Sequence, residues 1–297
     1  MLRSLLAVAL IVASLAAAPR AEAWCRMTTS TRAAAPGECV HDGVPLAWTH
    51  RCSEYAFYSS GWETSTSMSI DQLRDIWAVS FQQWEQITCS SGTMPRLQTL
   101  QVEEFSKCDQ AEYNQDAGNI NTIAFVEDWM SRGYDMAAYA VTTVWHNTST
   151  GEIYDADMEV NNGRGPYGVC DASAGCTDGT VDLQNVITHE AGHYFGMAHT
   201  PDSTVATMYA VSPPGEVLKR ILKTDDVDGF CNAYGAGFGD DDCDEEPPGG
   251  ESLECGGAVS CKCTAPGASA PGGASAGLGA TLTATWLVVR RRRRRAR

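Results

Sequence analysis

The stretch that decides the fold is His189-Glu190-Ala191-Gly192-His193-Tyr194-Phe195-Gly196-Met197-Ala198-His199. It holds three of the six histidines of the chain, in the pattern H-E-x-x-H-x-x-G-x-x-H. For this composition and a length of 297 residues, the chance that the spacing arises anywhere is on the order of 10⁻⁵. Coincidence is therefore excluded as an explanation, and the surrounding sequence can be interpreted from this motif outward.

A helix is predicted through the first part of the motif. Asp182 is a suitable N-cap residue, and apolar residues follow it at helical spacing. His189 and His193 are four residues apart, so both imidazoles leave the same helix face and can bind one metal ion. Gly196 can adopt a positive φ, which ends the helix and returns the chain so that His199 reaches the same ion.

Three neutral imidazoles favour a zinc site whose fourth position stays open for water. Glu190 lies about 100° around the helix from His189, so it is placed to act as the general base rather than as the third ligand. One alternative is a packed core in which the histidines are merely hydrogen-bonded, and another is a closed structural zinc site with a fourth protein ligand. The combination of Glu190, Gly196 and the third histidine favours a catalytic zinc site.

The extended motif resembles that of the metzincin metallopeptidases. Downstream, the stretch Thr207-Met208-Tyr209-Ala210 is similar to their Met-turn, in which a methionine lies beneath the metal. Thr200 after the third histidine, and Tyr209 directly after Met208, are most similar to the matrixin branch. Astacins and serralysins place a metal-reaching tyrosine where this chain has Ala210, so we assign no tyrosine ligand.

The resemblance implies an α+β, metzincin-like (zincin) domain over residues 45–236. Its expected parts are a twisted mixed five-stranded sheet, two long helices, a zinc site in the cleft, and a smaller C-terminal subdomain with the Met-turn and a C-terminal helix. Residues 222–230 resemble that helix, whose acidic pair, Asp225 and Asp226, would secure the chain N-terminus or the floor of the Met-turn. A solvated first turn favoured by the helix dipole is the alternative. Residues 211–216 would form the wall of the pocket for the residue after the scissile bond.

The region before the motif predicts one further helix and five strands. Ser69 and Gln72 form a candidate capping box, followed by apolar residues at spacings of three and four. The predicted strands are 46–57, 97–104, 119–127, 137–146 and 152–161. A turn at 148–151 predicts that the last two strands pair as a hairpin. By resemblance, 137–146 is the edge strand that lines the cleft, where an extended peptide would bind by strand addition.

Acidic residues Asp155, Asp157 and Glu159 alternate along the last predicted strand and so share one face. They indicate either a structural calcium site or an ordinary exposed acidic face. Calcium is therefore a second candidate cofactor beside zinc.

The two ends of the chain predict export and anchoring. Residues 1–23 have the features of a secretory signal peptide, and 24–44 form an N-terminal segment before the catalytic domain. Residues 237–271 are an acidic Gly/Pro/Cys linker, and 272–297 an expected apolar helix followed by an arginine-rich tail. This C-terminal end resembles the MYXO-CTERM sorting tail, which implies a membrane partner, processing near Cys261 and Cys263 by a sorting protease, and a cell-surface location.

Twelve cysteines in an exported chain predict disulfides. Cys170 with Cys176 and Cys89 with Cys108 are plausible pairs, and Cys39 could pair with Cys25 or Cys52. The propeptide string P-R-C-G-x-P-D that keeps many matrixins latent is absent, so the sequence leaves the restraint of activity open.

The predicted function is that of an exported zinc endopeptidase that cleaves extended protein or peptide substrates, with Glu190 as general base and zinc bound by His189, His193 and His199. A net charge of −16 argues against a nucleic-acid partner. The alternatives are a non-catalytic, zinc-stabilised surface binding module and a zinc amidase that acts on cell-wall substrates. The sequence does not give the oligomeric state.

Overall fold

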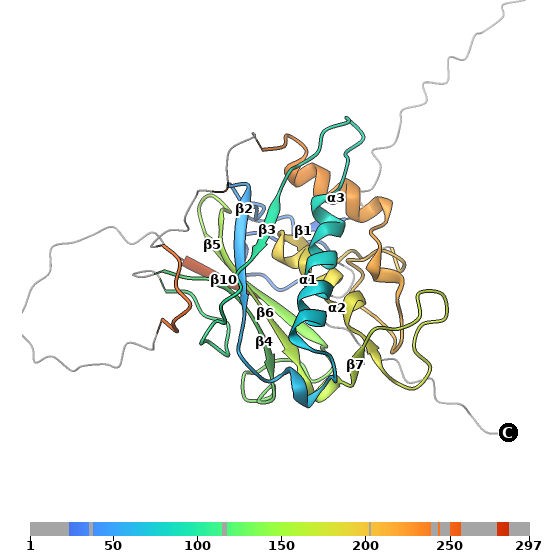
Figure 1. Cartoon of the computed structure of the whole chain (residues 1–297). Helices are drawn as coiled ribbons and strands as arrows, with labels where there is room; N and C mark the ends of the chain where they lie inside the picture. Colours follow the sequence, from blue (N-terminus) through green and yellow to red (C-terminus); the bar gives the residue numbers. More distant parts are fainter. Residues whose placement is uncertain are drawn as a thin grey trace, which may run out of the picture.

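A mixed sheet with helices packed on one face organises the molecule (Figure 1). The computed structural model describes residues 24–35, 38–114, 118–201, 203–238, 243, 250–256 and, as backbone, 278–284. In sheet order the strands are β10 (Leu278–Ala284), β5 (Ala140–Asn147), β6 (Ile153–Asn161), β4 (Asn121–Val126), β2 (Cys52–Phe57) and β3 (Gln98–Gln101). The expected signal peptide, residues 1–23, lies outside the described residues.

Five of these strands are the five that the sequence predicts, with shorter bounds. Strands β3, β2, β4 and β6 run parallel, and β5 pairs antiparallel with β6. The predicted hairpin is therefore confirmed, with Gly151 in its turn at φ 77°. Strand β2 begins six residues later than the predicted 46–57 strand; in that earlier part Ala47 makes an isolated bridge to Glu152.

Helix α1 (Ile70–Glu85) begins as the sequence predicts. The hydroxyl of Ser69 accepts the Gln72 backbone N–H at 3.3 Å, and the Gln72 side chain accepts the Ser69 N–H at 2.9 Å. The apolar face of α1 is buried against the sheet and against α2 (Leu183–Tyr194). Trp84 fixes the two helices together, because its indole N–H donates to the Thr188 carbonyl at 2.9 Å.

Short elements complete the domain. Strand β1 (Cys25–Arg26) pairs with β9 (Met197–Ala198), and β7 (Tyr167–Gly168) pairs with β8 (Val181–Asp182). The single 3₁₀ turns are η1 (Trp62–Thr64), η2 (Asn162–Arg164) and η3 (Leu218–Arg220). The predicted C-terminal helix is present as α3 (Thr224–Tyr234). The N-terminal segment is part of the fold, since β1 lies beside the end of α2 and the Met27 N–H donates to the Gly196 carbonyl at 2.9 Å.

Five disulfides join the described residues: Cys25–Cys39, Cys52–Cys243, Cys89–Cys231, Cys108–Cys255 and Cys170–Cys176. The predicted 170–176 bridge and the 25–39 alternative are confirmed. The predicted pairing of Cys89 with Cys108 is wrong, because each pairs with a cysteine far along the chain. Sequence proximity favoured a local pair, whereas the fold brings α3 and the segment 250–256 to these positions.

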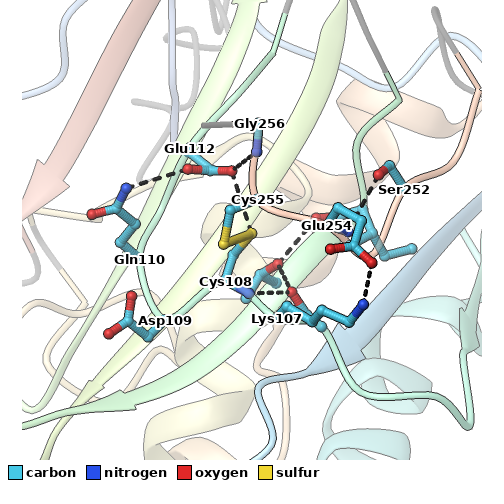
Figure 2. Close-up of a disulfide and its surroundings, with 12 residues drawn as sticks. Lys107, Cys108, Asp109, Gln110, Glu112, Ser252, Glu254, Cys255 and Gly256 are labelled. Atoms are coloured by element: carbon cyan, nitrogen blue, oxygen red, sulfur yellow. Dashed lines mark hydrogen bonds and ion pairs between the residues drawn. A yellow bond between two sulfur atoms is a disulfide. The ribbon is translucent and has the colours of Figure 1, made fainter. Parts of the chain in front are cut away.

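Part of the expected 237–271 linker is docked on the domain. Figure 2 shows Cys255 bonded to Cys108, with Glu254 paired to Lys107 and the Gly256 N–H donating to Glu112. Backbone bonds add to this contact, since the Lys107 N–H donates to the Leu253 carbonyl at 2.8 Å. The composition of this segment predicts a linker with no core of its own, and covalent attachment and backbone pairing hold residues 250–256 against the domain.

Within residues 272–297, expected as an apolar helix followed by an arginine-rich tail, residues 278–284 form strand β10 instead of a helix. Residues 272–277 and 285–297 of that prediction lie outside the described residues. Within the part of the chain that the structure describes, no helix has the length and apolar character needed to cross a bilayer. The strand forms because β5 offers an unpaired edge, which satisfies the backbone of an apolar segment as fully as a helix does.

Candidate metal centre

Helix α2 begins at the predicted N-cap. The Asp182 carboxylate accepts the Asn185 backbone N–H at 2.8 Å and pairs with the Arg220 guanidinium, whose Nε lies 2.7 Å away. Asp182 also accepts the Cys170 N–H at 2.8 Å. The start of the helix is thereby fixed to η3 and to the 170–176 disulfide loop, and this sets the positions of the histidines further along.

The three predicted histidines converge. The Nε2 atom of His199 lies 3.2 Å from Nε2 of His189 and 3.1 Å from Nε2 of His193. Helix α2 ends at Tyr194, and Gly196 has φ 78°, the predicted left-handed conformation that turns the chain toward His199. His189 and His193 are fully buried, whereas His199 is partly exposed.

Backbone carbonyls fix the ring orientations of two of the histidines. Nδ1 of His189 lies 2.6 Å from the Thr207 carbonyl, and Nδ1 of His193 lies 2.8 Å from the Met197 carbonyl. A carbonyl only accepts, so Nδ1 carries the proton on each ring and Nε2 keeps its lone pair. Burial lowers the pKa of His193 to about 4 and lowers the pKa of His189 and His199 as well.

These observations fit a metal ion. Uncharged imidazoles with lone pairs directed at one another repel unless a cation lies between them, and neutral imidazole nitrogen is the usual histidine ligand for zinc. Among the described residues, only two groups of three potential ligands lie close enough to share an ion. One is this triad; the other contains Cys108 and Cys255, whose sulfurs are consumed in a disulfide.

Glu190 lies on α2 next to the first histidine and is fully buried. The Thr142 hydroxyl on β5 donates to its carboxylate, with Oγ1 2.7 Å from Oε2. The sequence did not single out Thr142, because an alternating strand gives no indication of which residue faces the helix at this point. The structure identifies Thr142 as a polar side chain with no exposure that needs a hydrogen-bond partner and finds it in Glu190.

Met208 packs beneath the helix between the first two histidines. A Cβ on Gly192 would collide with the Met208 sulfur and would lie 2.7 Å from Cζ2 of Trp84, so only glycine permits this approach. Met208 itself is 3% exposed. Its assignment as the methionine of a Met-turn, made from the sequence, agrees with this placement and remains a prediction.

Asp226 holds the turn that contains Met208. Its carboxylate accepts the backbone N–H groups of Thr207 at 2.8 Å and Met208 at 2.9 Å. Of the two contacts that the resemblance offered for the acidic pair at the start of α3, Asp226 makes the one to the Met208 turn. The Thr207 carbonyl contacts His189, so α3 reaches the metal centre through a single residue.

The predicted pocket wall, residues 211–216, is fastened by a buried lysine. Lys219 Nζ donates to the Val211 carbonyl at 2.7 Å and lies 3.5 Å from the Glu216 carboxylate. Burial lowers the pKa of Lys219, and the Glu216 carboxylate opposes that shift. The Lys219 backbone N–H donates to the Asn185 side chain at 2.7 Å, so this segment is tied directly to α2.

The acidic row on β6 matches neither expectation. Asp155, Asp157 and Glu159 are buried, so they do not form an exposed face. Glu159 is neutralised by Arg132 and accepts a hydrogen bond from the Tyr134 hydroxyl. Asp157 accepts the N–H groups of Thr122 and Glu112.

Calcium is not supported at this row. The three carboxyl groups do not form a metal-binding group among the described residues. Burial raises the pKa of both Asp155 and Asp157, and the Asp155 charge raises that of Asp157 further, so both groups favour the uncharged form. Asp157 and Glu159 instead attach the loops that contain Glu112 and Arg132 to β6.

The arrangement of sheet, helices and converging imidazoles agrees with the metzincin-like domain expected from the sequence, which is the fold of a class of zinc metallopeptidases. Comparison with family models matches residues 47–235 to the matrixin peptidases, which is more than half of the chain. The chain belongs to the matrixin family. A search of curated proteins finds no match.

Proposed function

We propose that this matrixin is an exported endopeptidase in which His189, His193 and His199 hold zinc and Glu190 is the general base. The observation that carries the proposal is the convergence of three Nε2 atoms beside a buried carboxylate. When bound, zinc would supply a Lewis acid that polarises the peptide carbonyl and lowers the pKa of water.

Glu190 has two tasks in this proposal. It takes a proton from the attacking water and then delivers that proton to the leaving amine, which is general base followed by general acid catalysis. Thr142 orients the carboxylate for both, since its hydroxyl donates to Oε2 and fixes the direction of the side chain. The Asp226 carboxylate keeps the Thr207 carbonyl, and with it His189, in place.

Substrate is proposed to bind as an extended strand along β5, the strand that contacts Glu190. Strand addition uses main-chain hydrogen bonds, so most side-chain sequences are accepted. The edge in question is the one that β10 occupies. Protein or peptide substrates follow from membership of a peptidase family.

Export and anchoring complete the proposal. The pattern of residues 1–23 supports secretion, and the disulfides support a compartment in which they persist. The C-terminal arginine cluster and Cys261-Lys262-Cys263 support retention at a membrane and processing by a sorting protease. A cell-surface location is accordingly proposed.

Digestion of a peptide library tests the assignment. Glu190→Ala should abolish turnover while zinc content stays at the wild-type value, because the ligands remain. Glu103→Ala, which removes an exposed carboxylate paired with Arg74, should leave turnover unchanged. Equal cleavage by wild type and Glu190→Ala would remove Glu190 from the mechanism. Absence of peptide cleavage by the zinc-loaded wild type would favour a binding module, and cleavage of peptidoglycan alone would favour an amidase.

A further inference from the structure

Strand β5 has two edges, and both are used. One pairs with β6 from Ala140 to His146. The other pairs antiparallel with β10 over seven residue pairs, from Leu278 opposite Asn147 to Ala284 opposite Val141 (Figure 1). A strand offers its backbone hydrogen bonds on two sides only, so an additional peptide cannot pair with residues 141–147 while β10 is in place.

The register brings β10 to the proposed catalytic group. Thr283 is the partner of Thr142, the residue that donates to Glu190. The last two residues of β10 are therefore the closest in register to the catalytic carboxylate, and the strand runs from the β5–β6 turn toward it. This is the course that an extended substrate would take along the same edge.

A covalent tether keeps β10 near this edge. The chain is fixed at Cys255 by its bond to Cys108, and the Gly256 N–H donates to Glu112 (Figure 2). The neighbouring Tyr113 stacks on Trp145 of β5, with ring centroids 6.4 Å apart. The attachment point thus lies close to the half of β5 where β10 begins, and residues 257–277 connect the two.

We propose that β10 is a built-in competitor of substrate, which holds the full-length chain in a low-activity state until the tail is withdrawn or cleaved off. The inference rests on the proposed function, because it concerns the regulation of the same site. A tether of this kind gives an effective concentration of about millimolar, which a substrate at micromolar concentration must overcome. Cleavage anywhere in 257–277 would release β10 and open the edge, so tail processing would also be activation.

Full-length protein carrying Thr281→Pro and Leu282→Pro tests the proposal. Successive N–H groups of a strand point to opposite sides, so either Thr281 or Leu282 directs its N–H toward β5. Replacing both residues by proline therefore removes one N–H group that faces β5. The control is Ala274→Pro with Ser275→Pro, which places the same two prolines before β10 in the sequence. Intact mass confirms that each protein keeps its C-terminus at Arg297.

Steady-state kinetics on a fluorogenic peptide should show KM about tenfold or more lower in the β10 variant, with kcat unchanged, as competition requires. The control should match the wild type. Hydrogen exchange at the alternate amides of residues 141–147 that face β10 gives a readout without catalysis, and these amides should exchange faster only in the β10 variant.

Each outcome decides the question. Equal kinetics in the three proteins would overturn the proposal, whether or not exchange changes, and would leave the proposed peptidase intact. If no protein cleaves any peptide, the proposed function fails, and exchange alone then decides whether β10 guards the β5 edge. Equal exchange in that case would overturn the pairing as well.

Discussion

Thr142 on β5 donates its hydroxyl to the carboxylate of Glu190 on α2, with 2.7 Å between Oγ1 and Oε2. Both side chains are fully buried, so the contact is made away from water and holds the carboxylate in one orientation. It links the strand proposed to bind substrate to the group proposed to move the proton. Substrate position and base position are therefore set by one strand.

Replacement of Thr142 by valine keeps the shape of the side chain and removes the hydroxyl. We expect kcat to fall about tenfold, since a hydrogen bond to a charged group contributes about 1.5 kcal/mol or more. Zinc content should not change. Thr142→Ser should restore most of the activity, and Thr143→Val, on the opposite face of the same strand, should behave as wild type. Wild-type kcat in Thr142→Val would show that Glu190 is oriented without the hydroxyl.

Asp226→Asn should weaken zinc binding through the Thr207 carbonyl that contacts His189. The amide presents an NH₂ group where the carboxylate accepted N–H groups of Thr207, Met208 and Lys223, so at least one buried donor loses its acceptor. We expect about 2 kcal/mol lower stability and about tenfold weaker zinc binding, measured by thermal unfolding and chelator competition. Asp228→Asn, on an exposed position of the same helix, is the control. Unchanged zinc affinity would mean that the Thr207 carbonyl is held independently of Asp226.

The docking of residues 250–256 should depend on pH. Burial, together with a hydrogen bond to Glu54, raises the pKa of Glu251 from 4.5 to about 7. A raised acid pKa stabilises the docked state fully below about 4.5, and this contribution is lost as the pH rises through about 7. Protection factors of the Lys107 and Ser252 amides should fall over this range in the wild type and stay constant in Glu251→Gln. A parallel fall in both proteins would assign the effect to another group.

Two disulfides of unlike span should differ in their contribution to stability. Cys89–Cys231 joins residues 142 apart and ties the region after α1 to α3, whereas Cys170–Cys176 joins residues 6 apart. Loss of loop-closure entropy in the unfolded chain predicts about 5 kcal/mol for the long loop and about 2 kcal/mol for the short one. Urea unfolding of the two double Cys→Ala variants measures both. A larger loss for the 170–176 pair would show that strain or local packing outweighs chain entropy.

The sequence predicted the helices and the histidine cluster because local rules govern them. Ser69 and Asp182 are N-caps that need only neighbouring residues, and the spacing from His189 to His199 is set by one helical turn and one glycine. Five strands were found for the same reason, although tertiary contacts shortened them. Two-residue strands such as β1 and β9 carry no periodicity, so no local pattern could predict them.

The predictions that were wrong concern contacts between residues that lie far apart in the sequence. Cys108 was assigned to its nearest neighbour, yet its partner is Cys255, which chain topology alone brings close. Glu159 was expected to bind calcium or face water, but it forms an ion pair with Arg132. Arg132 lies in a loop, and no local sequence pattern predicts that this loop reaches Glu159. The hydropathy of the apolar tail predicted a helix. Residues 278–284 instead form a strand, because pairing with the edge of β5 satisfies their backbone hydrogen bonds as well as a helix would.

Metal content together with X-ray absorption spectroscopy, on wild type and Glu190→Ala, tests the central claim most directly. We predict one zinc ion per chain, bound by three imidazole nitrogens at about 2.0 Å, with the same spectrum in both proteins and turnover only in the wild type. Absence of zinc from active protein, or sulfur among its ligands, would contradict the claim that His189, His193 and His199 form the metal centre.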